Sequence, residues 1–129
     1  MNSEAVVALE ALVAAACDKP LARRIAALLG TDRGRKTFLR MLSDTFTARE
    51  ELSTPFADTS PIPDGPCFIF ADHGGFAFGE PSPSFEDALK RVNPTGAWLL
   101  VSASGRIGMY QPDDVIDDRV LIRASDRVR

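Results

Sequence analysis

The sequence contains little of what catalytic and metal sites are usually built from. Its 129 residues include one histidine and two cysteines, Cys17 and Cys67, and neither cysteine stands in a CxxC or Cys/His spacing. It has no GxSxG nucleophile motif and no phosphate-binding glycine loop that follows a strand and opens a helix. These absences argue against zinc, redox, hydrolase and nucleotide-binding chemistry. We therefore expect no catalytic residue, cofactor or metal site, and a protein that is not an enzyme.

Long hydrophobic runs are also missing. The apolar stretch VVALEALVAAAC near the N-terminus is interrupted by Glu10, and Glu4 stands before it where a secretion signal carries Lys or Arg. This stretch is too short to span a bilayer. Free buried cysteines suit a reducing compartment. The sequence thus predicts a cytoplasmic protein without a membrane anchor.

The overall composition is that of an ordinary globular chain. Apolar residues make up 45% and charged residues 26% of the sequence, which excludes wholesale disorder and fibrous repeats. A chain of this length buries a core without disulfides or metals. We expect a single domain over residues 1–129, with a helical part at 1–52, a proline-rich connector at 53–66 and a sheet part at 67–125.

The first half predicts three helices. Apolar residues at helical spacing indicate one helix over residues 3–17, and a second begins after Asp18 and ends at Gly30. The third begins after Thr31 or Asp32. Gly34 is expected to weaken its first turn by about 1 kcal/mol relative to alanine.

The second half predicts strands and one helix. CFIFA at 67–71 has no polar alternation, so this strand is expected to be covered on both faces. Ser84 caps a helix over 84–92, a hairpin turns at Ser104-Gly105, and a last strand covers 119–124. The predicted fold class is α+β: three N-terminal helices, then a four- to five-stranded, mainly antiparallel sheet with one inserted helix and helices on both faces.

The lone histidine lies in FADHGGF at 70–76. A three-residue loop at 73–75 would place Phe70 opposite Phe78 and put four phenylalanines on one face of the sheet, at positions 68, 70, 76 and 78. In that interpretation Asp72 accepts hydrogen bonds from turn amides. The alternative is a small-molecule enzyme or sensor that uses Asp72 and His73 at a pocket rim, where Trp98 is a further pocket candidate.

Positive charge is concentrated in one segment. Residues 19–40 carry a net charge of +6 in a chain of −3, which leaves −9 for the remainder. Such a division indicates either a solvated helix face or an anionic partner for the helical half. The residues proposed to bind it are Arg23, Arg24, Arg33, Arg35, Lys36 and Arg40.

Nucleic acid is one alternative partner for this segment. Ala26 and Gly30 have the spacing of a helix-turn-helix, but Lys36 falls where that motif needs an apolar residue. The isoelectric point of about 5.1 also disfavours a polyanion.

A protein partner, or a second copy of the chain, is the leading hypothesis. Arginine is enriched at protein interfaces, and complementary charge steers docking. The small size, acidic balance and absence of catalytic motifs resemble, in general character only, small bacterial adaptors and toxin-neutralising immunity proteins. The sequence therefore predicts a non-enzymatic protein-binding domain.

Overall fold

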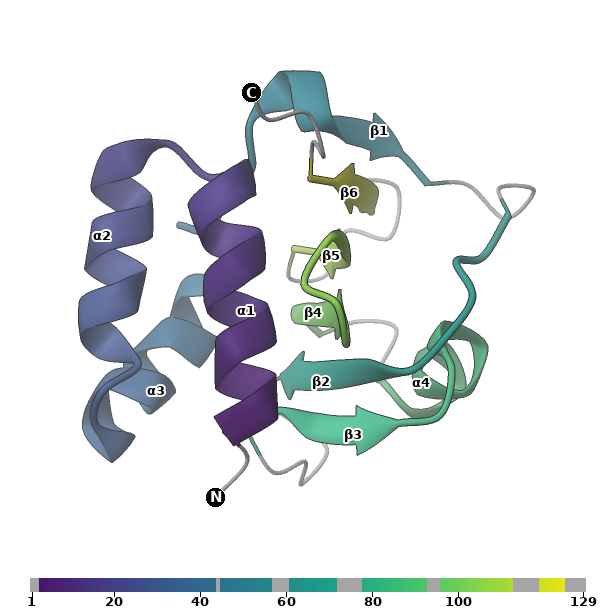
Figure 1. Cartoon of the computed structure of the whole chain (residues 1–129), viewed down its shortest axis with the longest axis horizontal. Helices are drawn as coiled ribbons and strands as arrows, with labels where there is room; N and C mark the ends of the chain where they lie inside the picture. The colour runs from purple at the N-terminus through teal and green to yellow at the C-terminus, as the bar shows by residue number, and fades with distance from the viewer. Residues whose placement is uncertain are drawn as a thin grey trace.

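The chain folds into an α+β structure, as the sequence predicts (Figure 1). The computed structural model describes residues 3–43, 45–56, 61–71, 78–92, 96–112 and 119–124. Its elements, in chain order, are α1 (Ser3–Ala16), α2 (Lys19–Leu28), α3 (Asp32–Met41), the 3-10 turn η1 (Glu50–Leu52), β1 (Ser53–Pro55), β2 (Cys67–Ala71), β3 (Glu80–Ser82), α4 (Phe85–Arg91), β4 (Trp98–Ser102), β5 (Ile107–Gln111) and β6 (Val120–Arg123). No described helix is long and apolar enough to cross a bilayer.

The sheet has six described strands in the order β1-β6-β5-β4-β2-β3, and every neighbouring pair is antiparallel. Two of them were not expected, because β1 lies inside the predicted connector and β3 is the short sequence EPS. Both occupy the edges of the sheet and contain a proline, Pro55 or Pro81. Proline has no amide proton to donate, so it suits an edge and discourages pairing with a further strand.

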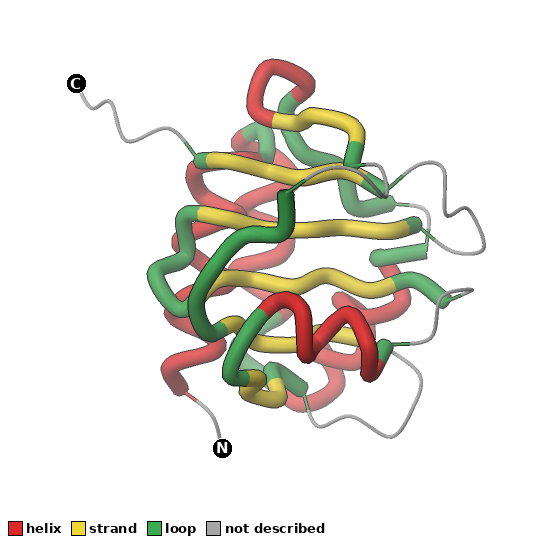
Figure 2. The backbone as a smooth tube through the Cα atoms, turned by 90° about the vertical axis from the view of Figure 1, so that its right-hand side faces the viewer, coloured by secondary structure: helices red, strands yellow, loops and turns green. Residues whose placement is uncertain are grey.

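Helices cover both faces of the sheet, as predicted. Helices α1, α2 and α3 pack on one face and α4 on the other, which Figure 2 shows with α4 in front of the strands. Leu9, Phe38 and Leu99 belong to the larger core under the three helices, and Phe85 and Leu100 belong to the smaller core under α4. Strand β2 lies between these two cores, so all five of its residues are buried.

The hairpin between β4 and β5 confirms the predicted turn. Gly105 has a positive φ of 78°, which glycine adopts without steric cost. A methyl group at this position would lie 2.8 Å from the Ala11 Cβ and 2.9 Å from the Ala8 carbonyl oxygen. The alanine-rich face of α1 therefore rests directly on the hairpin turn.

The predicted start of α2 at Asp18 is confirmed, and of the two starts left open for α3 the structure has Thr31 as the cap, but the role of Gly34 differs from the expectation. The Asp18 carboxylate accepts a hydrogen bond from the Leu21 amide at 3.2 Å, and the Thr31 hydroxyl accepts one from the Gly34 amide at 3.0 Å. Gly34 is buried, and a Cβ there would lie 1.9 Å from the Leu28 carbonyl oxygen. The missing side chain thus lets α3 cross closely over the end of α2, instead of merely weakening the helix.

The register predicted for the phenylalanine hairpin is wrong for the described strands. Ile69 pairs with Glu80 and Phe68 with Pro81, so β3 starts only after a turn that contains Phe78. The predicted loop at 73–75 and Phe76 lie outside the described residues. Phe70 and Phe78 nevertheless meet, with ring centroids 5.0 Å apart, and Phe68 joins them in the larger core. Aromatic packing therefore brings these side chains together without strand pairing.

Candidate binding surface

The predicted pocket candidates do not come together as a described site. Asp72 and His73 lie outside the described residues. Trp98 is fully buried at the start of β4, and its indole Nε1 has no hydrogen-bond partner among the residues that the structure describes. The guanidinium carbon of Arg119 lies 5.0 Å from the centre of the Trp98 ring. Trp98 is therefore a core residue covered by an arginine.

Gln111 explains how Arg119 is held in this position. The buried Gln111 Oε1 accepts hydrogen bonds from Arg119 Nε at 3.1 Å and Nη2 at 2.7 Å. The Gln111 Nε2 donates to the Gly96 carbonyl at 2.8 Å. This buried amide thus links β5, the residue before β6 and the segment that precedes β4. These contacts indicate that Gln111 has a structural role.

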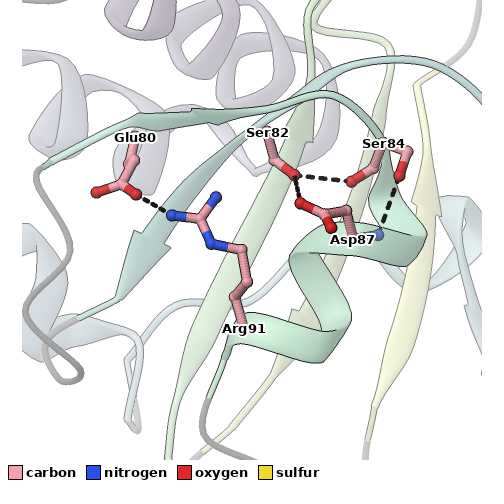
Figure 3. A network of polar contacts seen from close by, with 5 residues as sticks. All are labelled: Glu80, Ser82, Ser84, Asp87 and Arg91. Atoms are coloured by element: carbon pink, nitrogen blue, oxygen red, sulfur yellow. Dashed lines mark hydrogen bonds and ion pairs between the residues drawn. The ribbon is translucent and has the colours of Figure 1, made fainter.

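A second polar network joins β3 to α4 (Figure 3). The Ser82 hydroxyl lies 3.0 Å from the Ser84 carbonyl, to which it donates, and 3.5 Å from the Asp87 Oδ2. The Ser84 hydroxyl caps α4 by accepting from the Asp87 amide at 3.0 Å, and Arg91 forms an ion pair with Glu80. Ser82 is only 3% exposed. Its shorter contact is with the carbonyl, and both contacts lie at the first turn of α4, so this network fixes the start of the helix.

Neither cysteine is set up as a nucleophile. Burial raises the pKa of Cys67 to about 12, and the nearby Asp87 carboxylate adds to the rise. Burial also raises the pKa of Cys17 to about 11, with a further contribution from Asp18. Both groups are therefore neutral thiols near pH 7, whereas thiolates are the reactive and metal-binding form. In the described part of the chain, no three His, Cys, Asp or Glu side chains gather as metal ligands.

Five of the six predicted partner-binding residues are exposed. Arg23 and Arg24 lie on α2, and Arg33, Lys36 and Arg40 lie on α3. Considering the residues that the structure describes, none of these five has a carboxylate within ion-pair distance. Their charge is therefore presented to solvent.

Arg35, the sixth, is engaged within the fold. Its Nε donates to the Leu29 carbonyl at 2.9 Å, and its guanidinium carbon lies 5.4 Å from the centre of the Phe78 ring. Arg35 therefore connects the end of α2 to the turn before β3. Positive charge in the sequence did not distinguish this structural arginine from its solvent-exposed neighbours.

An open groove of about 430 Å³ runs along the exposed side of α3. The described residues that line it are Asp32, Arg33, Lys36, Thr37 and Arg40. The Thr37 hydroxyl donates to the Arg33 carbonyl at 3.1 Å, so the charged groups of the described lining are three cations and one carboxylate. We refer to these five residues as the α3 groove.

The opposite side of α3 determines which cations reach this groove. Gly34, Phe38 and Met41 are buried. They recur at helical spacing and turn the side chains of Arg33 and Lys36 away from the core. The α3 groove is thus the outer face of an amphipathic helix whose inner face is firmly packed.

Comparison with protein-family models, with curated proteins and with solved structures finds no significant match. The geometry of the chain itself therefore carries any functional argument.

Proposed function

We propose that the protein is a non-enzymatic binding domain that docks another protein through the α3 groove. The observation that supports this proposal is the row of three exposed cations, Arg33, Lys36 and Arg40, without a carboxylate partner among the described residues. The free buried thiols suit the reducing cytoplasm, where we propose that it acts as an adaptor or immunity-like protein.

Electrostatics favours a partner for this row over a purely structural role. Like charges three and four residues apart destabilise a helix by about 0.2–0.5 kcal/mol per pair. Arg40 in the last turn complements the dipole of α3, so the repulsion acts mainly on Lys36, which lies between Arg33 and Arg40. A partner that brings carboxylates to the groove relieves this repulsion and is steered toward it by the local charge.

A protein fits this groove better than nucleic acid does. Asp32 places a carboxylate among the cations, and the chain as a whole has a net charge of −3. A duplex presents one negative charge about every 1.7 Å of its axis, so a carboxylate inside the contact is repelled. A protein surface offers both signs of charge and accommodates Asp32.

The test compares two charge-reversed double variants, K36E/R40E in the α3 groove and R23E/R24E on α2. The two variants lower the net charge of the protein by the same amount, and each changes only exposed side chains. Immobilised full-length protein is incubated with cell lysate after nuclease treatment, and retained proteins are identified by mass spectrometry. Far-ultraviolet circular dichroism checks that each variant folds.

The proposal expects a retained protein that is lost with K36E/R40E and kept with R23E/R24E. If both variants lost the retained protein equally, that protein would be attracted by the overall charge and not by a docking site, which would refute the proposal. Retention of nucleic acid that depends on the groove, or of no protein at all by the wild type, would also refute the proposal.

A further inference from the structure

The spacing of the groove cations restricts the shape of a matching partner. Arg33, Lys36 and Arg40 lie three and four residues apart on the exposed side of α3. With a rise of about 1.5 Å per residue, their backbone positions span about 10.5 Å along the helix axis. The packed inner face fixes the backbone positions of this row, so a partner with charges at the same intervals fits it best.

A helix reproduces these intervals better than an extended segment does. Carboxylates at positions i, i+4 and i+7 of a helix span about 10.5 Å, equal to the cation row. Three carboxylates on one side of a strand fall at i, i+2 and i+4 and span about 13 Å. A helical partner therefore matches the backbone spacing of the row, whereas a strand exceeds it by about 2.5 Å.

Asp32 gives the groove a direction. Asp32 lies at the start of α3, beyond the Arg33 end of the cation row. A partner that places a cation next to Asp32 is therefore favoured. Antiparallel helices bring opposite dipole ends together, and a helix prefers carboxylates in its first turns and cations in its last. An antiparallel acidic helix with a Lys or Arg after its carboxylates satisfies both preferences.

From these observations we infer that the partner presents an acidic helix, antiparallel to α3, with carboxylates at i, i+4 and i+7 and a cation in the following turn. This inference rests on the proposed function, because it names the chemistry of the protein segment that occupies the α3 groove. The contact joins three carboxylates to Arg33, Lys36 and Arg40 and one cation to Asp32.

Three synthetic alanine-based peptides of identical composition test this geometry. The patterned peptide has glutamates at i, i+4 and i+7 followed by a lysine, the scrambled peptide breaks the spacing, and the reversed peptide places the lysine first. Each is titrated into the full-length protein at low ionic strength, and backbone amide chemical shifts are followed by nuclear magnetic resonance. A DNA duplex of equal charge is the fourth probe.

We expect the patterned peptide to bind about tenfold more tightly than the scrambled one, as three exposed ion pairs predict. Shifts should concentrate on α3, disappear with K36E/R40E and persist with R23E/R24E. The Asp32→Asn variant should reduce the preference for the patterned over the reversed peptide, because it removes the directional charge and leaves only the helix dipoles.

Equal binding of patterned and scrambled peptides, or tighter binding of DNA, overturns the inference. That outcome is distinguishable from failure of the proposed function. A protein still retained through Lys36 and Arg40 would preserve docking at the groove while excluding a helical partner.

Discussion

Arg35 of α3 lies over Phe78, with its guanidinium carbon 5.4 Å from the ring centre, while its Nε donates to the Leu29 carbonyl. One side chain thereby joins three parts of the fold: the end of α2, the body of α3 and the turn before β3. Its neighbour Lys36 points into the α3 groove instead. Adjacent basic residues thus lie in different environments, one packed within the fold and one exposed.

The first prediction tests this separation. Replacing Arg35 by Ala removes a hydrogen bond from a charged donor and a cation–π contact, so it should destabilise the protein by about 2 kcal/mol. Replacing Lys36 by Ala should change stability by less than about 0.5 kcal/mol, because the side chain is exposed. Urea unfolding measures both, and equal effects would contradict the structural role of Arg35.

A second prediction concerns the crossing of α2 and α3. The Gly34→Ala variant should lose about 3 kcal/mol or more, because the new Cβ meets the Leu28 carbonyl and forces the helices apart. Gly30→Ala is the matched control, since its nearest neighbour atom would be 3.9 Å away. That control should stay within about 1 kcal/mol of the wild type. A stabilised Gly34→Ala protein would mean that the close crossing is absent.

The third prediction addresses the anchor between the sheet and the end of α3. The hydroxyl of Tyr110 on β5 donates to the Leu42 carbonyl in the buried core. Tyr110→Phe keeps the ring, whose centroid is 4.9 Å from that of Phe46, but removes the donor. We expect a loss of about 1 kcal/mol in thermal or chemical unfolding. An unchanged midpoint would show that solvent replaces this contact without cost.

The fourth prediction follows from the raised thiol pKa values. In the unfolded chain both cysteines ionise near their ordinary value of 9.0, whereas in the folded protein the pKa is about 11 for Cys17 and about 12 for Cys67. The folded state therefore binds more protons than the unfolded state between pH 9 and 12. Stability contributed by the thiols is complete below pH 9 and falls as pH rises through this window.

Denaturant titrations at a series of pH values measure this loss. The Cys17→Ala/Cys67→Ala double variant should show a shallower decline above pH 9 than the wild type, although it starts less stable. At pH 7.4 a thiol reagent should label the native wild type far more slowly than the urea-unfolded chain. Rapid native labelling would show that the thiols are accessible.

The local elements of the fold were predictable because short-range chemistry specifies them. Asp18, Thr31 and Ser84 each accept an amide hydrogen bond at the start of a helix, and each precedes an apolar stripe at helical spacing. The Ser104-Gly105 turn likewise supplies the positive φ that its hairpin needs. These signals lie within a few residues of the structure that they determine.

Strands β1 and β3 were not predictable for the opposite reason. Each has three residues and a proline, and each exists because a longer neighbour, β6 or β2, offers hydrogen-bonding groups along its edge. The register beside β2 likewise depends on where Phe78 packs in the core. Such pairings arise from contacts between distant parts of the chain, which local propensity does not encode.

The charge of the candidate binding surface was predictable, but the residues that belong to it were not. The excess of basic residues at 19–40 was visible in the sequence, yet Arg35 turned out to stabilise the fold. The buried positions Gly34, Phe38 and Met41 would have identified the outward residues of α3. Gly34 obscured this pattern, because a glycine is not recognised as part of an apolar face.

The pairing of β1 with β6 bears on the timing of folding during synthesis. Strand β6 lies between β1 and β5, and its residues, Val120–Arg123, are made long after Ser53–Pro55. In a nascent chain that ends before β6, β1 has no neighbouring strand and one edge of β5 is unpaired. Contacts between segments so distant along the chain form slowly. On the ribosome, the helices and the β5-β4-β2-β3 part of the sheet are thus free to form early, while β1 and β6 pair only after residue 123 has left the exit tunnel.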